Sequence, residues 1–222
     1  GIIHRDIKPA NVLVTVQDGK PVPKIIDFGV AKATSQRLTE HTLYTQTGQL
    51  IGTPAYMSPE QAEMTNLDVD TRTDVYSLGV LLYELLVGAQ PFDARELRKT
   101  PLREIQRKLR EVEPPRPSTK AGALGKDSTQ SAANRRLDEK TFAKHLRGDL
   151  DWITMKAMEK DRTRRYDSAA SLATDIQRFL KNEPVLAGPP STAYRLRKYI
   201  RRNRVPLAFV ATVFLIFSLA LF

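Results

Sequence analysis

The chain has 222 residues, of which 41% are hydrophobic and 27% are charged, and these values suit a globular protein with one substantial core. It contains no cysteine, which excludes a disulfide framework and a cysteine-based zinc site. The net charge of +10 suggests a nucleic-acid-binding protein, but six positive charges lie within residues 195–204, where no acidic residue occurs. The basicity is therefore mainly local, and the apolar segment that follows it explains it better than nucleic acid does.

The first predicted elements are two short strands. Residues 12–16 are apolar and mostly β-branched, and residues 24–26 have the same character. Asp18 and Gly19 lie between them and form a strong hairpin-turn signal. The next segment, residues 30–58, is polar, rich in threonine and punctuated by glycine, which predicts a long loop. Loops of that length are usually functional or disordered.

Helical patterns dominate the middle of the chain. Residues 74–87 are apolar nearly all round, which predicts a helix that is buried in the core and ends at Gly88. Residues 94–111 predict a charged, moderately amphipathic helix, which Pro114 and Pro115 stop.

The composition changes after this second helix. Residues 118–134 are rich in Ser, Ala, Gly and Thr and contain no aromatic residue, which predicts a flexible linker. Helical patterning resumes at residues 150–159 and returns at residues 168–180, where Ser168 is a candidate N-cap. Three prolines between residues 184 and 190 then separate this globular part from the basic segment.

The C-terminal segment is a candidate membrane span. Residues 205–222 carry no charge, and a helix of this length spans about 27 Å, just short of a hydrocarbon core of about 30 Å. The sequence stops within this run, so we expect the span to continue further. A buried core helix is the alternative, but the run has no polar face. The basic residues directly before it predict that the N-terminal side faces the cytoplasm.

Three short motifs hold candidate catalytic side chains in loops that flank the predicted hairpin. They are His4-Arg5-Asp6 with Lys8 and Asn11, then Asp27-Phe28-Gly29, and finally Ser58-Pro59-Glu60. Any one of them alone would be an ordinary set of solvated polar residues, whereas three in this order and spacing are specific. Phosphoryl transfer asks a protein mainly for positioning and charge neutralisation. A carboxylate to orient a hydroxyl, a lysine for the phosphate and oxygen ligands for Mg²⁺ meet that need.

From residue 1 to about residue 182 the chain resembles the protein kinase family, specifically the bacterial-type Ser/Thr kinases. The resemblance implies an α+β, protein-kinase-like fold: a mainly α-helical C-lobe with a small β-hairpin that carries the active-site loops. A C-terminal transmembrane helix would follow. It also implies protein serine/threonine kinase activity, with ATP and Mg²⁺ as cofactors. A lysine at position 8 is typical of kinases that phosphorylate Ser or Thr rather than Tyr.

The resemblance implies a role for each residue that matches the catalytic motifs. Asp6 would orient or accept the proton of the substrate hydroxyl, and Lys8 would contact the transferring phosphate. Asn11 and Asp27 would bind Mg²⁺ and, through it, the nucleotide. His4 would have a packing and hydrogen-bonding role rather than a catalytic one.

Other matched residues would support the site from a distance. Asp74 would hold the backbone of the catalytic loop from the buried helix, and Glu60 would pair with Arg165. Thr53 would contact the catalytic loop where the substrate's acceptor residue binds.

Arg5, beside Asp6, implies regulation by phosphorylation of the activation loop, because a phosphate can pair with an arginine. The candidate acceptors are Thr39, Thr42, Thr45 and Thr47. The alternative is that these threonines only keep a loop soluble. A homodimer would allow autophosphorylation between chains.

The sequence departs from the family on its N-terminal side. It contains no G-x-G-x-x-G loop, no strand lysine for the ATP phosphates and no helix glutamate to pair with that lysine. These parts would lie upstream of residue 1, so we expect the 222 residues alone to have little or no kinase activity. We expect a C-lobe at 1–182 with a linker insertion at about 118–146, a basic juxtamembrane segment at 183–204 and a truncated transmembrane helix at 205–222.

Two other classes of protein stay open. A pseudokinase or scaffold usually lacks Asp6, Asn11 or Asp27, and all three are present. A basic nucleic-acid- or membrane-binding protein is the other, and the local placement of the charge favours anionic lipid. The preferred hypothesis is a single-pass kinase of the cell membrane, with a cytoplasmic catalytic domain that acts on protein substrates and does not bind nucleic acid.

Overall fold

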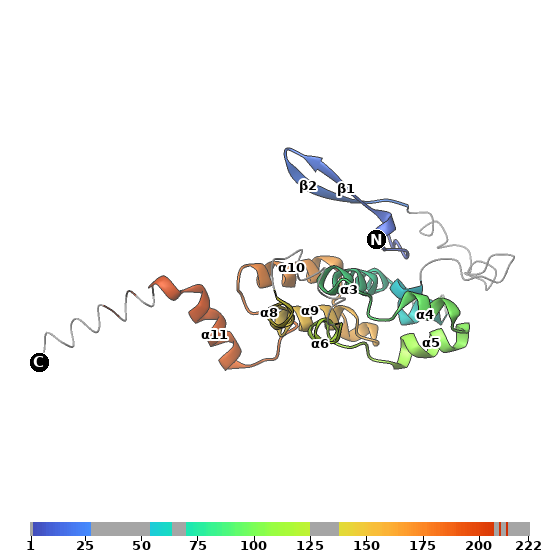
Figure 1. Ribbon diagram of the computed structural model, residues 1–222. Coiled ribbons are helices and arrows are strands. Elements are labelled where there is room, and N and C mark those ends of the chain that lie inside the picture. The colour runs from blue at the N-terminus through green and yellow to red at the C-terminus, as the bar shows by residue number, and fades with distance from the viewer. Residues whose placement is uncertain are drawn as a thin grey trace, which may run out of the picture.

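The computed structural model of the chain describes residues 2–27, 54–63, 70–124, 138–206, 209 and 212. In this part of the chain a helical body carries a single β-hairpin, which projects from it near the N-terminus (Figure 1). The strands and short 3-10 helices are β1 (Val12–Gln17), β2 (Lys20–Ile25), η1 (Pro9–Asn11), η3 (Pro54–Tyr56) and η5 (Arg162–Arg164). The α-helices are α2 (Pro59–Ala62), α3 (Arg72–Val87), α4 (Ala94–Lys99), α5 (Leu102–Glu111), α6 (Pro117–Ala123), α8 (Glu139–Leu146), α9 (Asp149–Ala157), α10 (Ala169–Leu180) and α11 (Thr192–Arg202).

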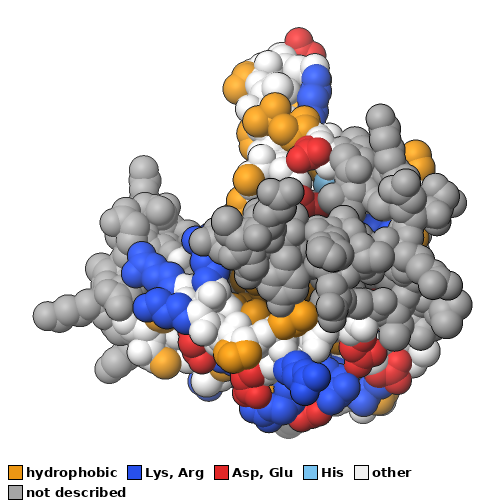
Figure 2. Space-filling model, turned by 90° about the vertical axis from the view of Figure 1, so that its right-hand side faces the viewer, with side chains coloured by type: hydrophobic (Ala, Val, Ile, Leu, Met, Phe, Trp, Pro, Cys, Tyr) orange, Lys and Arg blue, Asp and Glu red, His pale blue; other side chains and the backbone are white. Residues whose placement is uncertain are grey.

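The hairpin forms where the turn signal places it. Asp18 and Gly19 both have positive φ, at 51° and 71°, as a two-residue turn between twisted strands requires. β2 begins four residues before the predicted start, although it contains Pro21 and Pro23. A sheet of two strands has only edges, and an edge tolerates the missing N–H of proline. Figure 2 shows the hairpin standing above the body with hydrophobic side chains on its surface.

Helix α3 is the centre of the helical body. It contributes Tyr76, Val80 and Tyr83 to the larger cluster of buried side chains and Val75 to the smaller one. Gly79 lets α9 approach closely, because a Cβ there would lie 2.8 Å from the Cβ of Ala157. The predicted burial of residues 74–87 is confirmed for most of the helix, although Leu85 is exposed, and the helix begins two residues earlier.

The predicted single helix over residues 94–111 is wrong. The structure has two helices, α4 and α5, separated at Thr100 and Pro101, whose ψ angles of 136° and 147° are extended. Proline disfavours the α conformation in the residue before it, so Thr100 ends the first helix. The Thr-Pro pair is thus a local signal for a helix end, and the prediction missed it because the charged, amphipathic pattern continues on both sides of the pair.

The prediction of a flexible linker from residue 118 is wrong for its first part. Residues 117–123 form α6, and Ser118 and Ala121 are buried. Asp151 on α9 accepts hydrogen bonds from the backbone N–H of Ser118 (2.9 Å) and from its hydroxyl (2.7 Å). Residues 139–146, inside the expected insertion, form α8. Residues 125–137 lie outside the described residues, and the linker stays a prediction there.

The packed unit extends past the boundary expected at residue 182. Helix α10 begins at the predicted N-cap, since the hydroxyl of Ser168 accepts from the N–H of Ser171. Asp175 on α10 is fully buried and accepts from the backbone N–H groups of Leu186 (2.7 Å) and Ala187 (2.8 Å). A buried carboxylate is stable only when hydrogen-bond donors reach it, and here residues 186 and 187 provide two of them. The segment after α10 therefore packs against the helical body.

Among the described residues, no helix is both long enough and apolar enough to cross a membrane. Most of the span predicted at residues 205–222 lies outside the described residues, so the span stays a prediction.

Candidate active site

Three of the expected catalytic side chains meet at the base of the hairpin. The carboxylate of Asp6 accepts from Lys8 Nζ at 2.7 Å and from Asn11 Nδ2 at 3.0 Å, both at its Oδ2 atom. Asn11 Nδ2 also donates to the backbone carbonyl of Asp6 at 2.8 Å. The side chain of Asp6 is 27% exposed, so its carboxylate is held in place and still open to a substrate.

The backbone of this loop is held from the helical body. The two carboxylate oxygens of Asp74 on α3 accept from the N–H groups of His4 and Arg5, each at 2.8 Å. Gln61 Nε2 on α2 donates to the Arg5 carbonyl at 2.7 Å. Arg5 has φ of 68°, a conformation that non-glycine residues rarely adopt and that surrounding contacts must maintain. The contact expected between Asp74 and the loop is therefore present.

Asp27 follows the second strand and lies beside the same loop through the backbone. The N–H of Ile26 donates to the Asn11 carbonyl at 2.9 Å, and His4 Nε2 is 3.1 Å from the Ile26 carbonyl. Asp27 itself has φ of 64°. His4 is buried, and these contacts agree with a structural role for it. Phe28 and Gly29 of the same motif lie outside the described residues.

The donor set of Asn11 and Asp27 fits Mg²⁺. The amide nitrogen of Asn11 is used for two hydrogen bonds to Asp6, which leaves its amide oxygen as the available ligand. One carboxylate and one amide oxygen are hard ligands, and Mg²⁺ in phosphate-handling sites takes its other ligands from water and the substrate phosphates. Among the described residues no group of three or more His, Cys, Asp or Glu side chains could hold a metal ion by itself.

Glu60 and Arg165 form the expected ion pair behind the loop. Arg165 donates to both carboxylate oxygens of Glu60, at 2.6 and 2.8 Å, and both residues are buried. Burial by itself raises the pKa of Glu60, but the hydrogen bonds and charge of Arg165 outweigh it and hold that pKa below its usual value. Thr73 Oγ1 donates to Glu60 Oε1 at 2.8 Å.

Two supporting residues were not singled out from the sequence. Gln61 holds the Arg5 carbonyl and completes a capping box with Ser58 at the start of α2. The spacing Ser-x-x-Gln is a sequence signal for such a box and could have identified the helix start. Thr73 carries no comparable signal, because only the fold brings it to Glu60.

Several expected site residues lie outside the described residues. They are Thr39, Thr42, Thr45, Thr47 and Thr53. Arg5 is described, and its Nε atom is buried without a hydrogen-bond partner in the part of the chain that the structure describes.

Comparison with known proteins shows the family. The family described as "Protein kinase domain" matches residues 1–172, so the chain belongs to the protein kinase family and has its fold. The mainly helical body with a small sheet is the predicted fold class, apart from its transmembrane helix.

Individual relatives are bacterial Ser/Thr kinases. The chain is 35% identical over 184 residues to "Serine/threonine-protein kinase PknB" of Mycobacterium leprae, covering 83% of this chain and 24% of the relative. It is 37% identical over 185 residues to "Probable serine/threonine-protein kinase SCO3848" of Streptomyces coelicolor, covering 83% of this chain and 22% of the relative. The chain thus spans about a quarter of the length of the curated relatives it matches.

A solved kinase structure is also similar. The PknI kinase domain of Mycobacterium tuberculosis, a C20A_R136A double mutant, matches with a TM-score of 0.46 and 22% identity. The match covers 80% of this chain and 47% of that one.

Proposed function

We propose that the chain is the C-lobe of a serine/threonine protein kinase that transfers the γ-phosphate of ATP to Ser or Thr hydroxyls of protein substrates. The observation that carries the proposal is the arrangement of Lys8 and Asn11 around one carboxylate oxygen of Asp6. That arrangement fixes a partly exposed carboxylate beside a lysine, which is what orienting a hydroxyl next to a phosphate requires.

Each side chain then has a distinct task. Asp6 accepts the proton of the substrate hydroxyl, and Lys8 offsets negative charge on the transferring phosphate. Asn11 and Asp27 would hold Mg²⁺, which would supply charge neutralisation at the ATP phosphates. Asp74 keeps the loop backbone in place through its two hydrogen bonds.

Regulation by phosphorylation of the activation loop is part of the proposal. The buried Nε of Arg5 has no hydrogen-bond partner among the described residues, and a phosphate on Thr39, Thr42, Thr45 or Thr47 could pair with the guanidinium. A homodimer would allow one chain to phosphorylate the other. Phosphosite mapping of active protein that finds all four threonines unmodified would end this part of the proposal.

Membrane anchoring is a further part. The uncharged run 205–222 directly follows the arginine-rich segment 195–204, which indicates a single membrane span with the kinase domain on the cytoplasmic side. The basic segment would also attract anionic lipid.

The test is ATP-dependent phosphate transfer in the presence of Mg²⁺ by the full gene product. Replacing Asp6→Asn keeps the side-chain shape and should lower the transfer rate by about 10²-fold or more, because the proton acceptor is lost. The same chemical change at the exposed hairpin turn, Asp18→Asn, is the matched control and should leave the rate unchanged.

Transfer to Ser or Thr by the parent but not by Asp6→Asn supports the proposal. Equal transfer by both would show that Asp6 is not the proton acceptor. No transfer by a folded parent supplied with ATP would favour a pseudokinase or scaffold. The 222 residues tested alone should transfer little, since their sequence has no glycine-rich loop for the ATP phosphates.

A further inference from the structure

One side of α11 is docked on the helical body. The hydroxyl of Tyr194 donates to Asp149 Oδ1 at 2.9 Å and accepts from the N–H of Val185 at 3.1 Å. Lys198, one turn further on, forms an ion pair with Asp149 Oδ2. The side chains of Lys198 and Asp149 are only 11% and 10% exposed, so this ion pair is largely shielded from solvent.

Helix α11 is also closely packed against α9 and the loop that precedes α11. The ring of Trp152 on α9 meets the ring of Tyr194 edge to face, with the ring centroids 5.4 Å apart. A Cβ on Gly188 would lie 3.2 Å from atoms of both rings, so the loop before α11 passes tightly over this contact. Helix α11 is thus attached to α9 by a packed contact and not only by the chain that leads to it.

The opposite side of α11 exposes an apolar stripe. Leu196, Tyr199 and Ile200 are 58%, 53% and 48% exposed, and their spacing of three and four residues places them on one helix face. Basic side chains lie on both sides of the stripe. They are Arg195 and Arg202 on one edge, and Arg197 on the other, where Arg204, just past the end of the helix, also lies beside Leu196 and Ile200.

Most of these arginines carry charge that the described residues do not neutralise. Arg195, Arg197 and Arg204 have no acidic partner within ion-pair distance among the described residues, and Arg202 has a single exposed contact with Glu183 at 3.5 Å. An apolar face bordered by unneutralised arginines is the pattern of a helix that lies in a membrane interface.

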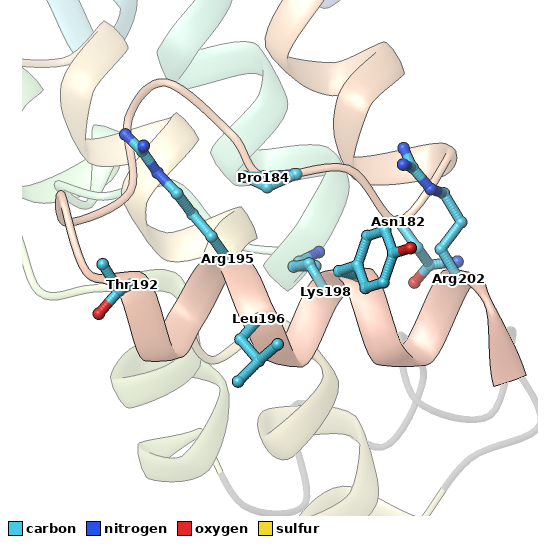
Figure 3. Close-up of a pocket in the computed structure, with 8 residues that line it drawn as sticks. Asn182, Pro184, Thr192, Arg195, Leu196, Lys198 and Arg202 are labelled. Atoms are coloured by element: carbon cyan, nitrogen blue, oxygen red, sulfur yellow. The ribbon is translucent and has the colours of Figure 1, made fainter. Parts of the chain in front are cut away.

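A groove runs along the Arg195 and Arg202 edge. It has a volume of about 460 Å³ and lies between α11 and the segment around Pro184. In Figure 3, Arg195 and Arg202 extend on the side of the Pro184 loop near opposite ends of the helix, whereas Leu196 projects from the other side. The groove thus has basic ends and apolar walls, which suits phosphate headgroups with their first methylene groups.

We propose that α11 lies in the surface of an anionic phospholipid bilayer, with Leu196, Tyr199 and Ile200 among the lipids and its docked side holding the kinase lobe at a set orientation. The inference rests on the membrane anchoring proposed above. Two observations select lipid as the occupant: the stripe is bordered by cations, and the uncharged run that begins at Val205 continues directly from the helix. The contact with Asp149 makes α11 a rigid connector and not a flexible tether.

The first test places a spin label at single cysteines, which the cysteine-free chain permits. The 222-residue chain is reconstituted in nanodiscs of phosphatidylcholine alone or of phosphatidylcholine mixed with anionic phosphatidylglycerol. Ile200→Cys reports on the stripe, and Arg103→Cys, exposed on the distant α5, is the control (Figure 1). Collisions with lipid-soluble oxygen and a water-soluble nickel chelate measure depth.

The label at residue 200 should be protected from the nickel chelate by at least threefold relative to the label at residue 103, and more in the anionic discs. Equal exposure at both positions in anionic discs would overturn the proposal. Protection that appears equally in detergent, together with a doubled mass, would show that a second copy of the chain covers the stripe and would also overturn it.

The second test separates the docked side from the lipid side. Labels at Ile200→Cys and at Gln177→Cys, which is exposed on α10, should give one narrow distance distribution in anionic discs. Tyr194→Phe with Lys198→Ala removes both side-chain contacts with Asp149 and should at least double the width while leaving nickel protection at residue 200 intact. An unchanged width would refute the rigid connection. Neither readout uses phosphate transfer, so failure here is distinct from failure of the kinase proposal.

Discussion

At the scale of single residues, Arg165 is the most heavily bonded charge behind the candidate site. Besides the two hydrogen bonds to Glu60, its guanidinium donates to the carbonyls of Glu159 (2.7 Å), Arg72 (3.2 Å) and Lys160 (3.2 Å). It therefore joins the start of α3 and the segment after α9 to Glu60 on α2, next to the helix residue that supports the catalytic loop.

Replacing Arg165→Met should destabilise the folded chain by about 3–5 kcal/mol, because it leaves the Glu60 carboxylate buried without its partner. The double variant Glu60→Gln with Arg165→Met removes the isolated charge and should recover part of the loss. Chemical unfolding of the three proteins measures this. A double variant that is less stable than Arg165→Met alone would contradict the explanation.

The acid dependence of stability should follow from the same pair. The pKa of Glu60 is lower in the folded chain than its ordinary value of 4.5, so the folded state holds the ionised form more firmly. Its contribution is fully present above about pH 4.5 and is lost as pH falls through the lower folded pKa. Thermal unfolding from pH 6 to pH 3 should therefore show a steeper loss for the parent than for Glu60→Gln. If the stability of the parent and of Glu60→Gln fell in parallel as pH is lowered, the ion pair would not be the source of the acid dependence.

At the scale of elements, the crossing of α3 and α9 depends on the absence of a side chain at Gly79. A Cβ there would lie 2.8 Å from the Cβ of Ala157 and 2.9 Å from the Cγ of Met158. In an exposed helix, glycine to alanine is favourable by roughly 1 kcal/mol. Here the packing conflict opposes that gain.

Gly79→Ala should therefore destabilise the chain by about 1–3 kcal/mol through overpacking. Gly122→Ala on α6 is the matched control, because among the described residues nothing outside its own stretch of helix lies within 4 Å of a Cβ at that position. The control should be neutral or stabilising by up to about 1 kcal/mol. The unfolding temperatures of both variants, each compared with that of the parent, test this prediction. Equal changes in unfolding temperature for the two variants would show that helix propensity, and not packing, governs the crossing of α3 and α9.

At the scale of the whole molecule, the segment after residue 182 belongs to the folded unit. Val185 is buried in the same cluster as Ile153 and Tyr166, and Asp175 takes two backbone hydrogen bonds from the residues that follow it. Without this segment, the carboxylate of Asp175 would keep, among the described residues, the hydrogen bond from the Tyr166 hydroxyl at 2.9 Å.

A chain that ends at residue 182 should accordingly be less stable than one that ends at residue 204. The difference should be at least about 2 kcal/mol, from the lost burial of Val185 and the lost hydrogen bonds to a charged group. Urea unfolding of both truncated chains tests this. Equal midpoints would mean that the segment is only attached to the body and does not stabilise it.

The parts of the molecule that were predictable are those whose signals are short-range. The Asp18-Gly19 turn, the Ser168 N-cap and the apolar run of α3 each follow from neighbouring residues, and the structure confirms them. The motifs around Asp6 and Asp27 identified the family for the same reason, because their residue types and spacing stand together in the chain.

The sequence by itself thus determined the family, the hairpin with its turn, the end of α3 at Gly88 and the start of α10 at Ser168. Only the tertiary structure decided that residues 117–123 fold and that residues 184–198 dock on the helical body. Both outcomes depend on buried carboxylates, Asp151 for the first and Asp175 and Asp149 for the second. A buried carboxylate is stable only where distant donors reach it, and which donors reach it depends on the packing of the helices rather than on the local sequence.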